Sequence, residues 1–276
     1  MAISNFIPTI WSENLYTALD KKYIAVSNCS REFEGEIKNK GSVVNICGVG
    51  SIDVKDYTKD YDMSNPQSLS DTVIELHIDQ AKCFNFQIDD VDRAQCTPRL
   101  MEAAMRVAAS SLANAADKYI YELAGKVDLQ INAYDATPET IIDSIIEARQ
   151  KLYENNVSDS TDVVLEVSPM VASVILKEKL ALGDNEVLNN GYLGTIAGCK
   201  IFVSNNIVET TSDMGDVKYK CLMRTTRAIA FAEQLSEIEA YRPEKRFADA
   251  IKGLHLYGAK VVYPNEMVTL DICIPF

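Results

Sequence analysis

The sequence predicts an α+β protein, because strand-like and helix-like segments occupy largely separate stretches and do not alternate as in a βαβ fold. Short strand patterns occur before residue 90, the clearest helix follows them, and strands dominate again after residue 200. The chain has 276 residues, of which 47% are hydrophobic, and this is enough for a substantial core. We therefore expect a strand-rich extension, a long helix, an α/β middle and a β-rich end, without internal repeats.

The N-terminal part predicts an arm and not a core. Residues 12–23 have the spacing of a short amphipathic helix, with Ser12 as its N-cap. From residue 31 to residue 70 charged residues are frequent and apolar residues come singly or in pairs. Within this stretch only two short pieces, at 42–47 and 51–56, resemble strands. This part of the chain is too polar to build a core of its own.

That polar stretch is the main clue to function. It contains strand fragments, but a two-stranded ribbon alone in water is only marginally stable. We therefore expect it to be ordered by lying on another copy of the protein, which implies obligate self-association. The alternative is a mobile surface loop. We interpret Gly48 and Gly50 as glycines that relieve backbone strain in a hairpin.

Two alternating strands and a long helix come next. Apolar and polar residues alternate over 72–79 and again over 83–89, so each strand is expected to bury one face. A helix is expected over 98–124, because Thr97 can cap its start and Gly125 stands where helices often end.

The second half of the chain mixes helices with strands. Thr137 is expected to cap a helix that ends before Asn155, and Ser168 a helix over 169–179. A short apolar strand is expected at 162–167, and a loop rich in Gly and Asn over 181–198. The remaining expected strands are 200–204, 228–233, 238–242, 259–263 and 267–274.

Charge and composition exclude several classes of protein. Forty acidic against 27 basic residues give a net charge of −13, which disfavours a nucleic-acid reader that works through basic patches. No apolar run approaches the length of a membrane span, and the N-terminus does not resemble a secretion signal. The seven cysteines are scattered without a Cys-x-x-Cys pair, so we expect them to be reduced and mostly packed.

Patterns that would carry catalysis are weak. The stretch Gly194–Lys200 is only a distant approach to a phosphate-binding loop, and we interpret it as a tight turn before a strand. His77 and His255 have no companion at metal-ligand spacing, so we interpret both as structural. The acidic cluster Asp89, Asp90 and Asp92 lacks the glycine and terminal glutamate of a calcium loop. We expect no catalytic, cofactor-binding or metal-binding residues, and no enzyme.

Three stretches carry a resemblance to a known family. Residues 71–95 resemble the segment that leads the major capsid proteins of tailed bacteriophages, the Hong Kong ninety-seven fold, from the extended loop into the spine helix. Residues 191–206 are similar to the Gly-rich turn and strand of the axial domain in that family. Residues 239–264 look like the return through its peripheral domain. The motifs are patterns of fold and specify no chemistry.

The resemblance implies a division of the chain into four parts. It implies an N-terminal arm with a short helix at 1–30, an extended β-hairpin loop at 31–82, a peripheral domain with the long spine helix at 83–131 and 238–276, and an axial domain at 132–237. The tip of the axial domain is expected at 182–192 or 209–216, where Gly, Asn and acidic residues cluster.

The resemblance also implies a function and partners. The chain is expected to self-assemble through hexamers and pentamers into an icosahedral shell around double-stranded DNA, bound without sequence specificity. A portal and a separate scaffolding protein are the other expected partners, and no membrane is involved. The shell is expected to form in the cytoplasm of a bacterial host and to become the virion capsid. Lys55 and Lys59 lie in the extended loop, but no motif identifies a partner for isopeptide cross-linking.

Charged residues near the end of the chain have a simpler interpretation than DNA contact. Arg242, Lys245 and Arg246 lie close to Glu239 and Glu244, so intersubunit ion pairs or solvated faces are expected. Two other functions remain open: an encapsulin-type nanocompartment shell, which shares the fold, and a small cytosolic α/β enzyme with a mobile loop. Neighbouring genes distinguish the first from a phage capsid, and electron micrographs distinguish the second.

Overall fold

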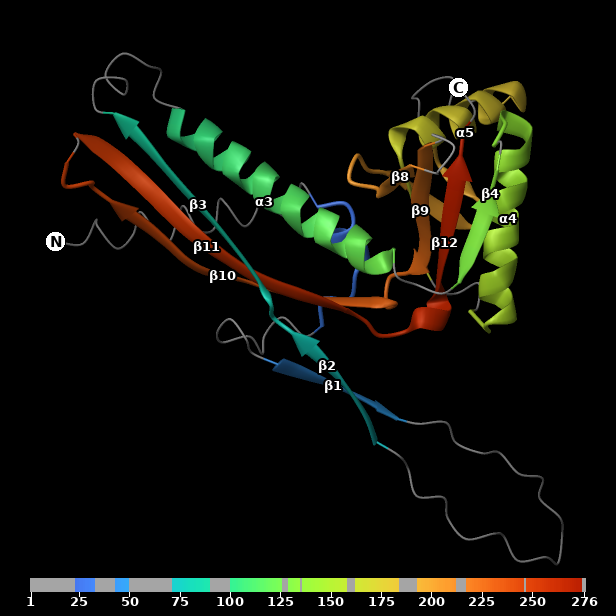
Figure 1. Ribbon diagram of the computed structural model, residues 1–276, viewed down its shortest axis with the longest axis horizontal. Coiled ribbons are helices and arrows are strands. Elements are labelled where there is room, and N and C mark those ends of the chain that lie inside the picture. The colour runs from blue at the N-terminus through green and yellow to red at the C-terminus, as the bar shows by residue number, and fades with distance from the viewer. Residues whose placement is uncertain are drawn as a thin grey trace, which may run out of the picture.

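The computed structural model describes ten parts of the chain: residues 23–32, 43–49, 71–89, 100–125, 129–134, 136–157, 162–183, 193–211, 217–245 and 247–274. Figure 1 shows three bodies in them: an elongated sheet with a long helix, a second sheet with two helices beside the end of that helix, and a ribbon that projects from the elongated sheet. None of the helices in the described parts combines the length and hydrophobicity that a bilayer crossing requires.

The elongated sheet has three antiparallel strands in the order β10-β11-β3. These strands are Ile229–Tyr241, Ala248–Val261 and Gln80–Asp89. The helix α3, Leu100–Ala124, runs along the sheet (Figure 1). Its small buried residues Ala109, Ala113 and Ala116 let it approach the strands closely. This confirms the expected long helix, although Thr97 lies outside the described residues.

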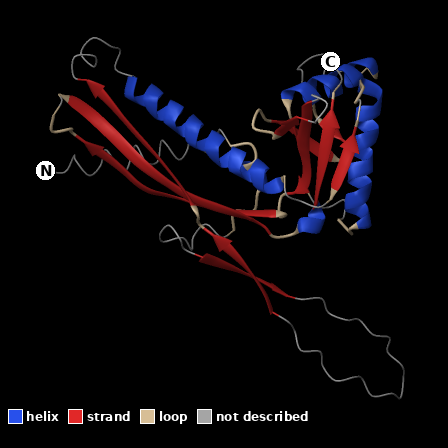
Figure 2. Cartoon of the chain, viewed as in Figure 1, coloured by secondary structure: helices blue, strands red, loops and turns tan. Residues whose placement is uncertain are grey.

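The second sheet has seven strands and forms its own hydrophobic core with α4 and α5 (Figure 2). Its order is β4-β12-β9-β5-β7-β6, with β8 also paired to β9. The bounds are β4 Gln130–Ala133, α4 Pro138–Glu154, β5 Val163–Val167, α5 Pro169–Ala181, β6 Thr195–Ile196, β7 Cys199–Val203, β8 Glu209–Thr211, β9 Val217–Thr225 and β12 Met267–Cys273.

Both expected helix caps in this part are confirmed. The Thr137 side chain accepts a hydrogen bond from the backbone nitrogen of Thr140. The Thr140 side chain in turn accepts one from the backbone nitrogen of Thr137, which completes a capping box. The Ser168 side chain caps α5 by accepting from the backbone of Val171. These caps explain why both helices begin where the sequence predicts.

The ribbon consists of β1, Val43–Val49, and β2, Asp71–His77, which pair antiparallel. The strand expected at 42–47 is confirmed as β1, which pairs along its whole length with β2. Gly48 consequently lies inside a strand, opposite Thr72, and not in a tight turn. Residues 51–56 and most of the expected helix at 12–23 lie outside the described residues.

Several strands differ from the sequence-based expectation. The strands expected at 228–233 and 238–242 are parts of one strand, β10, Ile229–Tyr241, whose register shifts between Leu235 and Glu237. The expected strand at 259–263 is only the end of β11. The sequence patterns do not predict β4, β8 or β9, nor β6, which lies within the loop expected at 181–198. The strand β9 was missed because Lys218, Lys220 and Arg224 interrupt its apolar pattern, although its last five residues are all buried.

Two strands also cross the expected domain boundaries. β12, expected with the peripheral domain, lies between β4 and β9 in the seven-stranded sheet. The first half of β10, expected in the axial domain, belongs to the three-stranded sheet. An apolar strand pattern shows that a strand is buried, but it does not show which sheet receives it. Residues 209–211, expected in a loop tip, form β8.

Candidate assembly surfaces and the buried junction

One face of the ribbon is seated on the elongated sheet of the same chain. Val44 and Ile46 of β1 and Leu76 and Ile78 at the end of β2 are buried, and they pack against three residues of the sheet: Ala230, Ala232 and Leu256. The expectation that another copy must supply the missing half of this ribbon is therefore wrong for its base. Sequence patterns could not predict this contact, because the residues of the sheet that receive the ribbon lie more than 150 residues later in the chain.

The opposite face of the ribbon is open. Val43 and Val73 are 45% and 49% exposed, and the side chains of His77 and Glu75 approach each other at 3.4 Å while remaining mostly exposed. Figure 1 shows the ribbon leaving the body of the protein beneath β10 and β11. A projecting strand pair with apolar residues on its free face is suited to contact another protein surface.

Gly258 of β11 determines how closely the ribbon can cross the sheet. A Cβ atom at this position would lie 2.2 Å from the backbone oxygen of His77 and 3.1 Å from the Cα of Ile78. Both contacts are with backbone, which cannot rotate away as a side chain can. Only glycine fits at this crossing point.

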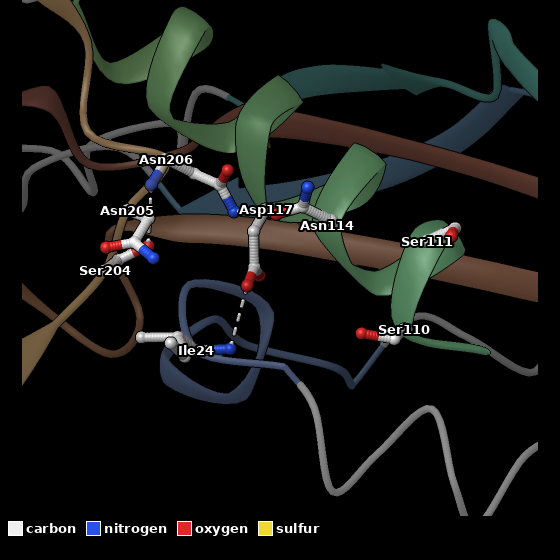
Figure 3. Close-up of a pocket in the computed structure, with 8 residues that line it drawn as sticks. All are labelled: Ile24, Ser110, Ser111, Asn114, Asp117, Ser204, Asn205 and Asn206. Atoms are coloured by element: carbon white, nitrogen blue, oxygen red, sulfur yellow. Dashed lines mark hydrogen bonds between the residues drawn. The ribbon is translucent and has the colours of Figure 1, made fainter. Parts of the chain in front are cut away.

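A second feature is a buried junction between the N-terminal segment, residues 23–32, and the rest of the protein. Asp117 of α3 points at the start of the short 3₁₀ helix Val26–Asn28 (Figure 3). Its carboxylate accepts hydrogen bonds from the backbone nitrogens of Ile24, Ala25 and Val26 at 3.0, 3.0 and 3.1 Å. One aspartate therefore accepts from three backbone N–H groups at the start of this helix that would otherwise lack a hydrogen-bond partner.

The seven-stranded sheet holds the same segment through a buried ion pair. Arg224 of β9 and Glu166 of β5 are fully buried, with Nη2 and Oε1 3.0 Å apart. Arg224 also donates to the backbone oxygens of Asn28 and Ala25 at 2.7 and 2.9 Å, and the Asn28 amide donates to Glu166 at 3.0 Å. The charged pair is thus satisfied partly by the N-terminal segment.

The three-stranded sheet contributes a third contact. The buried carboxylate of Glu233 accepts hydrogen bonds from Tyr23 and Arg31 of the N-terminal segment. His255 Nε2 lies 2.8 Å from the same carboxylate. Ser30 also forms a parallel bridge with Ala230. His255, which the sequence predicts to be structural, is fully buried inside this sheet.

The Asp117 carboxyl predicts a pH dependence of stability. Burial raises its pKa from 3.8 to about 6, and the three backbone hydrogen bonds act in the opposite direction. The folded protein therefore binds this proton more tightly than the unfolded chain, so this contribution to the free energy of unfolding falls as pH rises from 3.8 to about 6. We expect urea midpoints of unfolding to fall less steeply with pH in Asp117→Asn than in the parent protein.

The matched control for this measurement is Asp143→Asn, which changes an exposed carboxylate on α4. It is expected to keep the pH dependence of the parent protein. Equal slopes for the parent protein and Asp117→Asn would contradict the prediction.

A pocket of about 310 Å³ lies beside this junction (Figure 3). Hydroxyl and amide side chains line most of it, from Ser110, Ser111 and Asn114 of α3 and from Ser204–Asn206 after β7. Asn206 donates a hydrogen bond to Asn114 across the pocket. Asp117 also lines the pocket, and its carboxylate is engaged by backbone donors, whereas the other polar groups of the lining are neutral hydroxyls and amides.

The structure disperses the residues that the sequence singled out. His77 lies on the exposed face of the ribbon, Asp89 ends β3, and Gly194–Lys200 forms the expected turn, with positive φ at Ala197 and Gly198. Lys200 pairs with Asp162 at 2.9 Å. Asp90, Asp92, Lys55, Lys59 and Arg246 lie outside the described residues. No group of three or more potential metal ligands occurs within the described part of the chain.

Two other expectations have partial answers. Glu239, expected to pair between subunits or to face solvent, is 2.6 Å from Lys252 on the neighbouring strand of its own sheet.

Cys29, Cys199, Cys221 and Cys273 are buried free thiols, as expected, whereas Cys83 is exposed. Burial raises the pKa of Cys29 to about 11, which keeps this thiol neutral at physiological pH.

Sequence reasoning missed the charged residues of the junction. Glu166 interrupts an otherwise apolar strand, and Asp117 shares the buried side of α3 with Ala113 and Ile120. A charge at a position that the periodicity assigns to the core is a signal of a buried pair. The pattern could have identified these residues, but not their partners.

No family model and no curated protein matches the sequence. Solved structures do match it. A structure of Mycobacterium phage Che8 shares 29% identity over 90% of both chains, with a TM-score of 0.72. The capsid of Ralstonia phage GP4 covers 94% of this chain and 91% of its own, at 12% identity and a TM-score of 0.67. A virus-like particle from Pyrococcus furiosus covers 98% and 100%, at 12% identity and a TM-score of 0.54.

Proposed function

We propose, from the fold that it shares with the capsid proteins of tailed phages, that this chain is the subunit of a capsid shell. The observation that carries the proposal is the match over nearly its whole length, with a TM-score of 0.72 and 29% identity to the structure from Mycobacterium phage Che8. The resemblance seen in the sequence is confirmed at the level of the fold. Fold alone does not specify function, so the surfaces of the chain have to support self-association as well.

The ribbon supports self-association. Its inner face is seated on its own chain, and its outer face carries the exposed residues Val43 and Val73. The seat fixes the direction of the ribbon, and the outer face is free to contact a neighbouring copy. Contacts in which a ribbon meets a different surface of the next subunit are heterologous, and such contacts build rings and closed shells.

The proposal extends to the organisation of the shell, its partners and the place of its assembly. The subunits form hexamers and pentamers around double-stranded DNA, with a portal and a separate scaffolding protein as partners, and the shell assembles in the cytoplasm of a bacterial host. The net charge of −13 supports weak contact between the inner wall and DNA. We assign the three-stranded sheet with α3 to the peripheral domain and the seven-stranded sheet to the axial domain. The role is structural and involves no catalysis.

A nanocompartment shell is the second candidate. The virus-like particle from Pyrococcus furiosus shares the fold over 98% of this chain at 12% identity, and a shared fold is compatible with either kind of shell. Its TM-score of 0.54 is lower than the 0.72 obtained for the phage structure. Portal and terminase genes beside this gene would identify a phage capsid, whereas a gene for a cargo enzyme would identify a nanocompartment.

Electron microscopy of the purified protein tests the proposal. We expect shells or capsomers in negative stain and a large assembly in size-exclusion chromatography with light scattering. Phe247, at the turn between β10 and β11, is 81% exposed, so Phe247→Ser removes an apolar contact surface with little effect on the folded subunit. This variant is expected to assemble at least about tenfold less than the parent protein at equal concentration.

The matched control is Glu244→Ser, which changes an exposed polar residue of the same turn. It is expected to assemble as the parent protein does. A parent protein that stays a small monodisperse oligomer under all conditions would contradict the proposed function. Full assembly of Phe247→Ser would contradict only the contribution of this turn to assembly, and not the proposed function.

A further inference from the structure

Two neighbouring crossings join strands of the two large sheets directly, in addition to the connection from α3 to β4. One runs from β9 to β10 through residues 226–228, and the other runs from β11 to β12 through residues 262–266. Glu266, in the 3₁₀ helix Pro264–Glu266, joins them: it accepts from Thr225 at 2.5 Å and from Arg227 at 2.9 and 2.6 Å. Two short crossings that are bound to each other form a natural hinge between the sheets.

The N-terminal segment, residues 23–32, spans this hinge and joins a sheet through its backbone at the Ser30–Ala230 bridge. It is bound to α3 through Asp117, to the seven-stranded sheet through Glu166 and Arg224, and to the three-stranded sheet through Glu233. A single short segment thus contacts α3 and one or more strands of each large sheet.

The segment is held by hydrogen bonds to buried carboxylates, and such contacts favour all-or-none attachment to the rest of the protein. Asp117, Glu166 and Glu233 are all buried, and each one takes part of its hydrogen bonding from the segment. A small displacement would leave buried charges short of partners, which is costly. A complete detachment would let water reach these groups instead. The segment is therefore expected to be either fully attached or fully released.

We propose that residues 23–32 form a brace that sets the angle between the three-stranded and seven-stranded sheets, and that the paired crossings act as the hinge when the brace is released. In a shell, and here the inference rests on the proposed function, this angle determines the curvature that a subunit contributes. Attachment or release of the brace then lets one sequence occupy positions of different curvature.

The test weakens the brace without opening the core. The variant Tyr23→Phe with Asn28→Ala and Arg31→Gln removes polar contacts to Glu233 and Glu166 but keeps the ring of residue 23 against Phe231. A matched control, Asn85→Ala with Lys252→Gln, removes polar contacts that lie within the three-stranded sheet alone.

The distance between the body that contains α3 and the body that contains α4 is measured in dissociated subunits. Spin labels at Lys118 of α3 and Asp143 of α4 are attached through non-cysteine chemistry, because Cys83 is exposed. Hydrogen exchange at the amides of Ala25 and Val26 reports on the brace in the same samples. We expect a narrow distance distribution for the parent and control proteins. For the brace variant we expect one at least about twofold broader, with faster exchange.

Two results would overturn the inference. One is an unchanged distance distribution in a variant whose segment amides exchange freely, because the angle would then be set without the brace. The other is a broadened distance distribution while these amides stay fully protected, because the sheets would then change their angle with the brace still attached. If the amides stay protected and the distances are unchanged, Asp117→Asn is added to weaken the remaining contact with α3, and the same two results decide. Since both measurements use separate subunits, they stand even if the parent protein forms no shell. If it does, the brace variant is expected to give shells of mixed diameter.

Discussion

Replacing Arg224 by methionine is expected to lower the free energy of unfolding by about 3–5 kcal/mol, the cost of leaving one member of a buried ion pair alone. The Glu166 carboxylate would stay buried without its 3.0 Å partner, and the backbone oxygens of Ala25 and Asn28 would each lose a donor. Methionine fills much of the same volume, so the loss reports on charge and hydrogen bonding more than on a cavity. Urea denaturation of the dissociated subunit, followed by circular dichroism, measures the effect.

Lys200→Met provides the control. Lys200 pairs with Asp162 at 2.9 Å, but the two side chains are 56% and 66% exposed, and an exposed pair contributes about 0–1 kcal/mol. Adding Glu166→Gln to Arg224→Met is expected to recover part of the stability, because it removes the unpaired charge. Equal losses for Arg224→Met and Lys200→Met would show that the buried pair does not hold the junction together.

Gly258→Ala is expected to unseat the ribbon and abolish assembly. The added Cβ would lie 2.2 Å from the backbone oxygen of His77, so the end of β2 has to move away from β11. Movement of that kind uncovers Leu76 and Ile78, which are fully buried in the seat. The overpacking itself costs about 1–3 kcal/mol. Hydrogen exchange along β2 measures the displacement, and electron microscopy measures the loss of assembly.

Gly253→Ala distinguishes a backbone clash from a general cost of alanine in β11. A Cβ at Gly253 would lie 2.4 Å from the ring of Phe84, which is a side chain that can rotate. We therefore expect a smaller loss of stability and no change in the exchange of β2. If Gly258→Ala kept its β2 amides protected and assembled normally, the close crossing would not be what positions the ribbon.

Local patterns predicted most individual elements. The spine helix, the helices capped by Thr137 and Ser168, and the alternating strands around residue 72 and residue 83 were all readable, because caps and periodicity act within a few residues. The polar stretch between residues 31 and 70 also predicted an extension, and its described strand, β1, lies in the projecting ribbon. These features were sufficient to recognise the resemblance to capsid proteins.

The partners of these elements could not be predicted in the same way. The seat of the ribbon joins Leu76 to Ala230, and the junction joins Asn28 to Glu166, across long separations in sequence. The placement of β12 in the seven-stranded sheet is a further example. Hydrophobic burial is non-directional, so a buried pattern fits many partners equally well.

The amino-acid sequence by itself determined the class of fold, the positions of the capped helices and the presence of a polar extension too poor in apolar residues to form a core. Only the tertiary structure decided that the base of this extension rests on its own chain, that Gly258 sets the closeness of that contact, and that three buried carboxylates converge on residues 23–32. The physical reason is range: capping and periodicity depend on neighbours along the chain, whereas a buried charge or a close crossing depends on which distant segment folding brings beside it.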